Sequence, residues 1–258
     1  MALLKGIQVT KNYSGLSAVD HVDFEVNAGE IFGLIGPNGA GKTTLLNVIT
    51  ATERITIGEI FFEERKISEL KAYQIGRLGI ARTFQIVKPF KNLTVKQNVI
   101  VGAWFGKEGR KRNLKEVSDK AEEVLFLTNL INKKDALADQ LTTSEKKRVE
   151  LAKTLATDPK LLLLDEVMAG LNHKEVGDMM ELIQHINSLG TTILVIEHVM
   201  KAIMGISHRV LVMHHGRKIA EGLPEEVAKD TRVVEAYLGK KYAQRGMTGI
   251  GYAASSGN

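Results

Sequence analysis

The chain has 258 residues, a formal net charge of +5 and no cysteine, which excludes disulfide bonds and thiolate chemistry. Hydrophobic residues make up 44% of the sequence, a share typical of a globular protein. The apolar runs at 161–164 and 193–196 are far shorter than the roughly 20 residues of a membrane-spanning helix, and the N-terminus lacks the apolar core of a signal peptide. One large α/β domain, or such a domain with an inserted subdomain, is expected in the cytosol.

The basic residues favour solvated surface charge over a binding patch. Their clusters are scattered along the chain, at 107–112, 133–134, 146–148 and 240–241. Aromatic residues make up only 5% of the sequence. A positive charge could also suit nucleic acid or an anionic membrane surface, but this distribution gives either interpretation little support.

The N-terminal part contains the most informative motif. Residues 3–31 alternate apolar and polar side chains between polar turns, which predicts short antiparallel strands. Residues 30–35 then form an apolar run typical of a buried strand, and the apolar positions within 45–49 predict a helix. Between the two lies G-x-x-x-x-G-K-[ST] at 36–44, so the motif has the strand–loop–helix context that it requires.

This loop predicts binding of a nucleoside triphosphate. Glycines let successive backbone N–H groups point at phosphate oxygens, and the helix N-terminus adds partial positive charge. Lys42 would reach the β- and γ-phosphates, and Thr43 would place its hydroxyl on Mg²⁺. A chance match is the alternative, but the flanking elements argue against it. The predicted phosphate-binding residues are Gly36, Pro37, Asn38, Gly39, Ala40, Gly41, Lys42, Thr43 and Thr44.

The middle of the chain changes character. Residues 58–62 predict another strand, but from about 87 to 158 the apolar spacing is helical, at 116–131 and again at 148–156. This block is interpreted as an inserted helical subdomain. Strand signals return at 161–164.

Near-continuous apolar strands separated by helices then predict a parallel sheet covered on both faces. The strand at 161–164 is followed by a helix from Asn172 to Gly190, and a second buried strand follows at 191–196. Residues 209–213 and 218–220 flank His214-His215-Gly216, which predicts a hairpin. The two histidines are interpreted as turn residues, with metal binding as the alternative.

Three predicted strands end in chemically active residues: the loop at 36–44, Asp165-Glu166 and His198. Ligands of open α/β sheets lie at the carboxyl ends of the strands, so these groups should converge on one nucleotide. Asp165 would hold Mg²⁺, Glu166 would be the general base for water, and His198 would orient that water. Taken singly, the acidic pair could be a helix N-terminus and the histidine structural, but their joint order favours function.

Several segments resemble the ATP-binding subunits of ABC transporters, most closely those that drive branched-chain amino acid import. Residues 82–85 and 90–95 are similar to that group's Q-loop and the segment after it. Residues 161–172 resemble its Walker B strand and D-loop, and 196–198 its H-loop. The resemblance covers roughly residues 3–240.

The resemblance implies further roles and partners. Gln85 would contact Mg²⁺ and the attacking water, and Tyr13 would stack on adenine, an ordinary strand-end tyrosine being the alternative. It also implies ATP and Mg²⁺ as cofactors, a second ATP-binding subunit, integral membrane permease subunits and a periplasmic or extracellular substrate-binding protein. The chain would then lie on the cytoplasmic face of the plasma (inner) membrane, with no nucleic acid partner.

Two departures from the family pattern stand out. The signature Leu-Ser-Gly-Gly-Gln, which grips the γ-phosphate bound to the opposite protomer, is replaced by Leu-Thr-Thr-Ser-Glu at 141–145. Side chains at Thr143 and Ser144 would obstruct close approach and disfavour positive φ, while Thr142 and Glu145 should still form a capping box. Val167 also replaces the family's proline. We therefore expect a heterodimer in which this chain's own site hydrolyses ATP and the partner's site is weakened.

The expected fold is a P-loop NTPase (RecA-like) parallel-sheet core of the α/β class with an antiparallel β subdomain and an inserted α-helical subdomain. The core would comprise 1–86 and 158–222, the helical subdomain 87–157, and a C-terminal helix with a mobile tail 223–258. The expected function is ATP hydrolysis that energises amino acid import, with a urea or amide importer, a lipid exporter, a degenerate regulatory cassette or a soluble ABC-type protein acting on nucleic acid as alternatives. The last class usually carries two cassettes or a long coiled-coil insert, and neither is seen.

Overall fold

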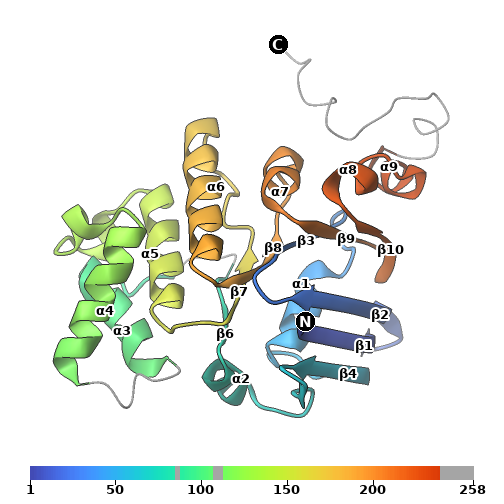
Figure 1. Ribbon diagram of the computed structural model, residues 1–258, viewed down its shortest axis with the longest axis horizontal. Coiled ribbons are helices and arrows are strands. Elements are labelled where there is room, and N and C mark those ends of the chain that lie inside the picture. The colour runs from blue at the N-terminus through green and yellow to red at the C-terminus, as the bar shows by residue number, and fades with distance from the viewer. Residues whose placement is uncertain (85–87, 107–112, 239–258) are drawn as a thin grey trace. The chain divides into compact units, whose positions relative to one another are not determined.

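The computed structural model describes residues 1–84, 88–106 and 113–238 (Figure 1). The chain divides into two compact units, the first formed by residues 1–71 and 194–258 and the second by residues 72–193. Gln85, the basic cluster at 107–112 and the expected tail beyond residue 238 lie outside the described residues.

The first unit contains an antiparallel sheet with the strand order β2-β1-β4-β5. Its strands are β1 (Ala2–Tyr13), β2 (Leu16–Asn27), β4 (Ile57–Phe62) and β5 (Arg65–Lys66). The expected antiparallel strands are confirmed, and two of them are long rather than short. Gly6 pairs with Phe24, and a Cβ atom on Gly6 would lie 2.2 Å from the Phe24 ring. Glycine is therefore needed where this ring crosses β1.

The first unit also carries parallel strands. The strand β3 (Ile31–Ile35), buried throughout, pairs in parallel with β9 (Arg209–His214), which forms the expected hairpin with β10 (Arg217–Gly222). The helices of this unit are α1 (Lys42–Ile49), α7 (Met200–Ile206), α8 (Pro224–Val227) and α9 (Thr231–Leu238). Arg209 bonds to Glu30 at 3.0 Å and to Glu221, which ties the start of β9 to residues beside β3 and on β10.

The second unit contains the parallel pair β6 (Ile80–Arg82) and β7 (Leu161–Asp165), with Ile80 opposite Leu161. The helices α2 (Ala72–Leu78) and α6 (His173–Ser188) flank this pair in the sequence. The strand β8 (Thr192–Ile196) begins in the second unit and ends in the first. The four leucines before Asp165 are all buried, as a strand of a covered parallel sheet requires.

The expected helical insert is present in the second unit. It contains α3 (Val95–Phe105), α4 (Leu114–Leu127) and α5 (Thr143–Leu155), with 3₁₀ turns at Ile131–Lys133 and Ala138–Gln140 (Figure 1). The prediction of one helix over 116–131 was too long, because Asn129 has a φ of +57° and ends the helical path. The helical spacing at 148–156 corresponds to the C-terminal part of α5.

Capping boxes explain where these helices begin. Thr142 Oγ1 accepts from Glu145 N, and Glu145 accepts in return from Thr142 N, which confirms the expected box and starts α5 at Thr143. Asn113 and Asn172 do the same for α4 and α6. Among the described residues, no helix is long and apolar enough to cross a membrane.

Candidate functional site

The loop at 36–44 joins β3 to α1 and is packed tightly from both sides. Gly36 has a φ of +152°, and a Cβ atom there would lie 2.2 Å from the carbonyl oxygen of Met213 on β9. Gly41 has a φ of +100°, and its Cβ would lie 2.2 Å from the carbonyl oxygen of Ala18 on β2. Both glycines are therefore required by conformation and by space, which leaves the backbone free to approach a ligand.

Lys42 supplies the positive charge of the loop. Its side chain is only 6% exposed, and Nζ donates hydrogen bonds to the carbonyl oxygens of Gly36 at 2.6 Å and Pro37 at 3.0 Å. The ammonium adds its charge to the N-terminus of α1, where backbone N–H groups and the helix dipole favour an anion such as phosphate. Thr43, next in the chain, is exposed, so its hydroxyl is accessible to a metal ion.

The β9–β10 hairpin supports the loop from outside. Gly216 N donates to Ala40 O at 3.0 Å, and Asp20 N donates to Gly216 O at 2.8 Å. The rings of His214 and His215 lie 4.0 Å apart, and burial, with a smaller contribution from His215, lowers the pKa of His214. His215 and Gly216 form the turn between β9 and β10.

Two further predicted residues belong to the same unit as the loop. Tyr13 ends β1, is 39% exposed, and has the ammonium of Lys11 at 4.7 Å from its ring centre. The stacking of Tyr13 on adenine stays a prediction. His198 is exposed in the short segment between β8 and α7.

The second unit carries the acidic pair. Asp165, at the end of β7, is 2% exposed, and its Oδ2 accepts a hydrogen bond from Arg82 Nη2 at 2.7 Å. Its other oxygen, Oδ1, is buried and has no hydrogen-bond partner within the described residues. A buried carboxylate oxygen left without a donor fits Mg²⁺ or a water bound to it, so the residue suits the predicted metal role.

The site residues thus fall into two sets. The loop, Tyr13 and His198 lie in the first unit, and Asp165 and Glu166 lie in the second. Gln85 lies outside the described residues. The convergence of the two sets on one nucleotide stays a prediction.

Sequence reasoning missed Arg82 and Tyr237. Arg82 ends β6 and pairs with Asp165, and a lone arginine at the end of a short strand was an available signal. Tyr237, on α9, hydrogen-bonds the backbone of Gly36, and burial raises the pKa of its phenol to about 12. Only the tertiary fold links this C-terminal tyrosine to the phosphate loop.

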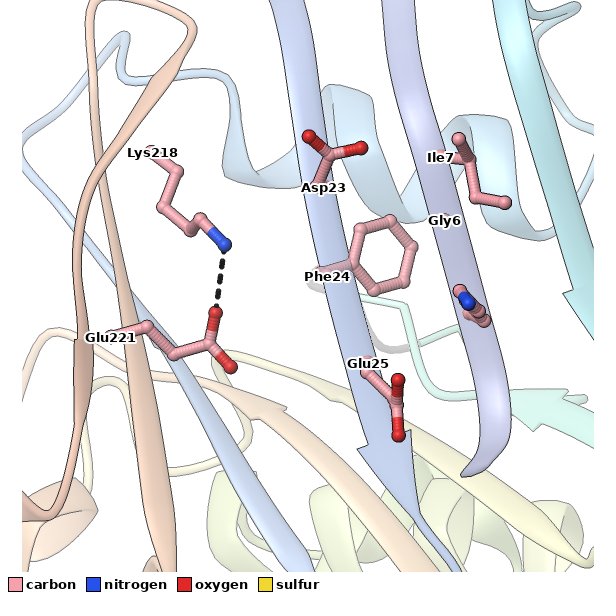
Figure 2. A pocket seen from close by; sticks show the side chains of 8 residues that line it. Gly6, Ile7, Asp23, Phe24, Glu25, Lys218 and Glu221 are labelled. Carbon is pink, nitrogen blue, oxygen red and sulfur yellow. Dashed lines mark hydrogen bonds and ion pairs between the residues drawn. The ribbon is translucent and has the colours of Figure 1, made fainter. Parts of the chain in front are cut away.

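A groove of about 350 Å³ in the first unit contains none of the predicted site residues. Figure 2 shows Lys218 and Glu221, both on β10, paired along one side of it, with the Phe24 ring beside Gly6. Asp23 accepts two hydrogen bonds from Gln8, each at 2.7 Å. These charges are satisfied within the protein, so the groove adds nothing to the nucleotide site.

Comparison with known proteins settles the family. The sequence model of the family described as "ABC transporter" matches residues 19–169, which include the loop and the acidic pair. The chain belongs to the ABC transporter family. A second model, described as "Branched-chain amino acid ATP-binding cassette transporter", matches residues 217–243. An ABC cassette of this kind is an ATP hydrolase coupled to transport.

Curated relatives of this ABC cassette span nearly its whole length. The high-affinity branched-chain amino acid transport ATP-binding protein LivG of Salmonella typhimurium is 40% identical over 240 residues, 88% of this chain and 94% of LivG. The corresponding protein BraF of Pseudomonas aeruginosa is 35% identical over 244 residues, 90% of this chain and 96% of BraF.

Solved structures show the same cassette fold. An ATP-binding cassette of an ABC transporter in its ADP conformation matches with a TM-score of 0.85 and 31% sequence identity. The match covers 93% of this chain and 100% of the solved chain. A dimeric bacterial ABC transporter cassette matches with a TM-score of 0.78 and 26% sequence identity, and the match covers 86% of this chain and 98% of the solved chain. The expected P-loop NTPase fold of the α/β class is thereby confirmed.

Proposed function

We propose that this ABC cassette binds and hydrolyses ATP to energise import of branched-chain amino acids through separate membrane subunits. The observation that carries the substrate class is the 40% identity to LivG over nearly the full length of both chains. The match of residues 217–243 to the branched-chain cassette model supports it from a second segment. The cassette would work at the cytoplasmic face of the plasma membrane, with a substrate-binding protein on the other side.

The proposed nucleotide chemistry divides among the named residues. The loop and Lys42 would bind the phosphates, and Tyr13 would stack on adenine. Thr43, Asp165 and Gln85 would hold Mg²⁺, which supplies charge neutralisation on the phosphates when bound. Glu166 would take the proton of the attacking water, and His198 would orient that water. The buried Oδ1 of Asp165, which has no hydrogen-bond partner within the described part of the chain, supports the metal role.

Two substitutions test these roles. Lys42→Ala should abolish ATP binding, because the loop loses its buried cation; Lys201→Ala, on the exposed surface of α7, is the matched control. Glu166→Gln should bind ATP without hydrolysing it, with Glu181→Gln on the exposed face of α6 as control. Binding is measured by equilibrium filtration and hydrolysis by phosphate release. Full turnover in Glu166→Gln would refute the general-base assignment.

A heterodimer is proposed from the altered signature segment. Thr143 and Ser144 lie in the first turn of α5, and neither has a positive φ, as expected for residues that carry a side chain. Each side chain adds atoms where glycine would let a phosphate approach the helix N-terminus. The partner's site would be weakened and this chain's own site would not.

The signature proposal is tested by restoring glycine at Thr143 and Ser144 and assaying ATPase in the assembled complex. Both the rate and the ATP affinity should rise if these side chains obstruct the partner's nucleotide. Thr157→Gly, beyond the end of the same helix, controls for added backbone flexibility. An unchanged rate and an unchanged ATP affinity would show that these side chains do not obstruct the partner's nucleotide.

Exposed aromatic residues in the second unit support docking to a membrane subunit. Phe84, Phe90 and Phe105 are 52%, 48% and 69% exposed, and exposed aromatic side chains are suited to contact with a partner. Asn98 holds the segment in place, because its Oδ1 accepts from Phe90 N at 2.8 Å. Phe90→Asp should prevent co-purification with membrane protein and leave ATP binding unchanged. Phe126→Asp, at a residue 74% exposed on α4, is the control and should leave both co-purification and ATP binding unchanged.

The substrate is tested by uptake. The complex that co-purifies with the chain is reconstituted in vesicles and assayed with leucine, isoleucine and valine, and with polar amino acids, urea and amides. ATP-dependent uptake of the branched-chain set alone supports the proposal. Uptake of urea or amides, lipid export, or co-purification with RNA in place of membrane protein would each replace it by one of the alternatives.

A further inference from the structure

The turn that follows β7 holds Glu166 in an uncommon backbone conformation. Glu166 has a φ of +54°, in the left-handed region that a glutamate rarely adopts. Ala169 N donates to Glu166 O at 3.3 Å, which closes a turn over residues 166–169. A residue in this region persists only when its surroundings fix it, so the contacts of the turn decide where the carboxylate lies.

Lys147 contacts both ends of this turn. It lies in the second turn of α5 and is only 8% exposed. Its Nζ donates to the carbonyl oxygens of Glu166 at 3.3 Å and Ala169 at 2.5 Å. A desolvated ammonium needs acceptors, and charge-assisted hydrogen bonds are the strongest that a backbone carbonyl accepts. One cation therefore links the first and last residues of the turn to α5.

The neighbouring basic residues of α5 point elsewhere. Lys146 Nζ donates to Asp139 O at 3.0 Å, and Arg148 Nη2 lies 3.8 Å from the Asp178 carboxylate on α6. Val167, which follows Glu166, does not fix the backbone φ of the turn as a proline would. The two hydrogen bonds from Lys147 restrain the backbone of the turn instead.

We propose that Lys147 is a positioning residue that holds the Glu166 turn in its productive conformation. It ties the helix that opens with the signature segment 141–145 to the turn that carries this chain's own general base, so a movement of α5 reaches Glu166 directly. This inference rests on the proposed role of Glu166. The hydrogen bonds from Lys147 to Glu166 and Ala169 go to backbone carbonyl oxygens of the turn, so its role is to position the turn.

The backbone part is tested by amide hydrogen exchange on the full chain. Lys147→Met removes the donors at similar length, Lys147→Arg keeps a cation that reaches both carbonyls, and Lys146→Met is the matched control. Exchange at residues 167–171 should accelerate in Lys147→Met alone, while the amides of α5 keep their protection. Unchanged exchange at 167–171 would overturn the proposal, whatever the role of Glu166.

The catalytic part is tested by ATPase kinetics of the co-purified complex. In Lys147→Met, kcat should fall roughly 10- to 100-fold because the carboxylate loses its alignment, while KM for ATP stays constant because the phosphate loop is untouched. Lys147→Arg should restore most of kcat, and Lys146→Met should match the wild type. A rise in KM with constant kcat, or no rescue by arginine, would overturn the positioning role.

Glu166→Gln separates the two proposals. If it keeps full turnover, the general-base assignment fails, while the exchange experiment still decides whether Lys147 holds the turn. Where Lys147→Met fails to fold, Lys147→Gln replaces it with the same readouts. Wild-type kcat and exchange in Lys147→Gln would then contradict the proposal.

Discussion

Replacing Arg82 with methionine should destabilise the second unit strongly. The Arg82 and Asp165 side chains are 6% and 2% exposed and meet at 2.7 Å, so the substitution leaves a buried carboxylate without its cation. Breaking a buried ion pair on one side costs about 3–5 kcal/mol. At about 2–4 °C per kcal/mol for a chain of this length, the melting temperature should fall by about 6–20 °C.

The assay is urea and thermal unfolding followed by tryptophan fluorescence, because the single tryptophan of the chain, Trp104, lies in α3 of the second unit. Arg82→Met and Asp165→Asn should each destabilise, and the double variant should recover most of the loss, since no charge is then left unpaired. Lys91→Met is the control, because Lys91 is 75% exposed and lies 3.9 Å from Asp139. Additive losses in the double variant would refute the reasoning.

Three further predictions concern the loop and the caps. The wild-type protein should lose stability at alkaline pH, and Tyr237→Phe should remove that loss. The pKa of the phenol is about 12 in the folded chain and about 10 in the unfolded chain, so the free energy of unfolding falls by about 2–3 kcal/mol between these pH values. The measurement is the change in urea midpoint between about pH 9 and 12. Thr142→Ala should cost about 1 kcal/mol by removing the α5 cap, and Thr142→Ser should cost little; equal melting temperatures would contradict this. Gly41→Ala should abolish ATP binding because its Cβ would lie 2.2 Å from Ala18 O, whereas Gly177→Ala on α6, with nothing within 4 Å, should bind normally.

Local sequence signals worked where the structure depends on local physics. The strand–glycine loop–helix order predicted the conformation at Gly36 and Gly41, and the spacing of Thr142 and Glu145 predicted the start of α5. The end of α4 was misjudged, because apolar spacing continues past Asn129 while the backbone does not. Periodicity reports which face of a helix is buried and says little about the residue at which a helix ends.

Contacts between residues far apart in the chain could not be predicted from the sequence. The pairing of Arg82 with Asp165 joins residues 83 positions apart, and the bonds from Lys147 to the Glu166 turn cross from helix to strand end. No spacing rule connects such residues, because their proximity follows from the register of β6 on β7 and the packing of α5.

The sequence by itself determined the family, the phosphate loop and the residue types for ATP chemistry, because each depends on side chains adjacent in the chain. The tertiary structure decided how those residues are held. It places two carbonyl oxygens around Lys42 Nζ and leaves Asp165 Oδ1 without a donor among the residues it describes. It also gives Glu166 a left-handed φ and brings Lys147 to its carbonyl oxygen. Burial sets these properties, since a charge removed from water must be met by partners that only the folded chain brings near.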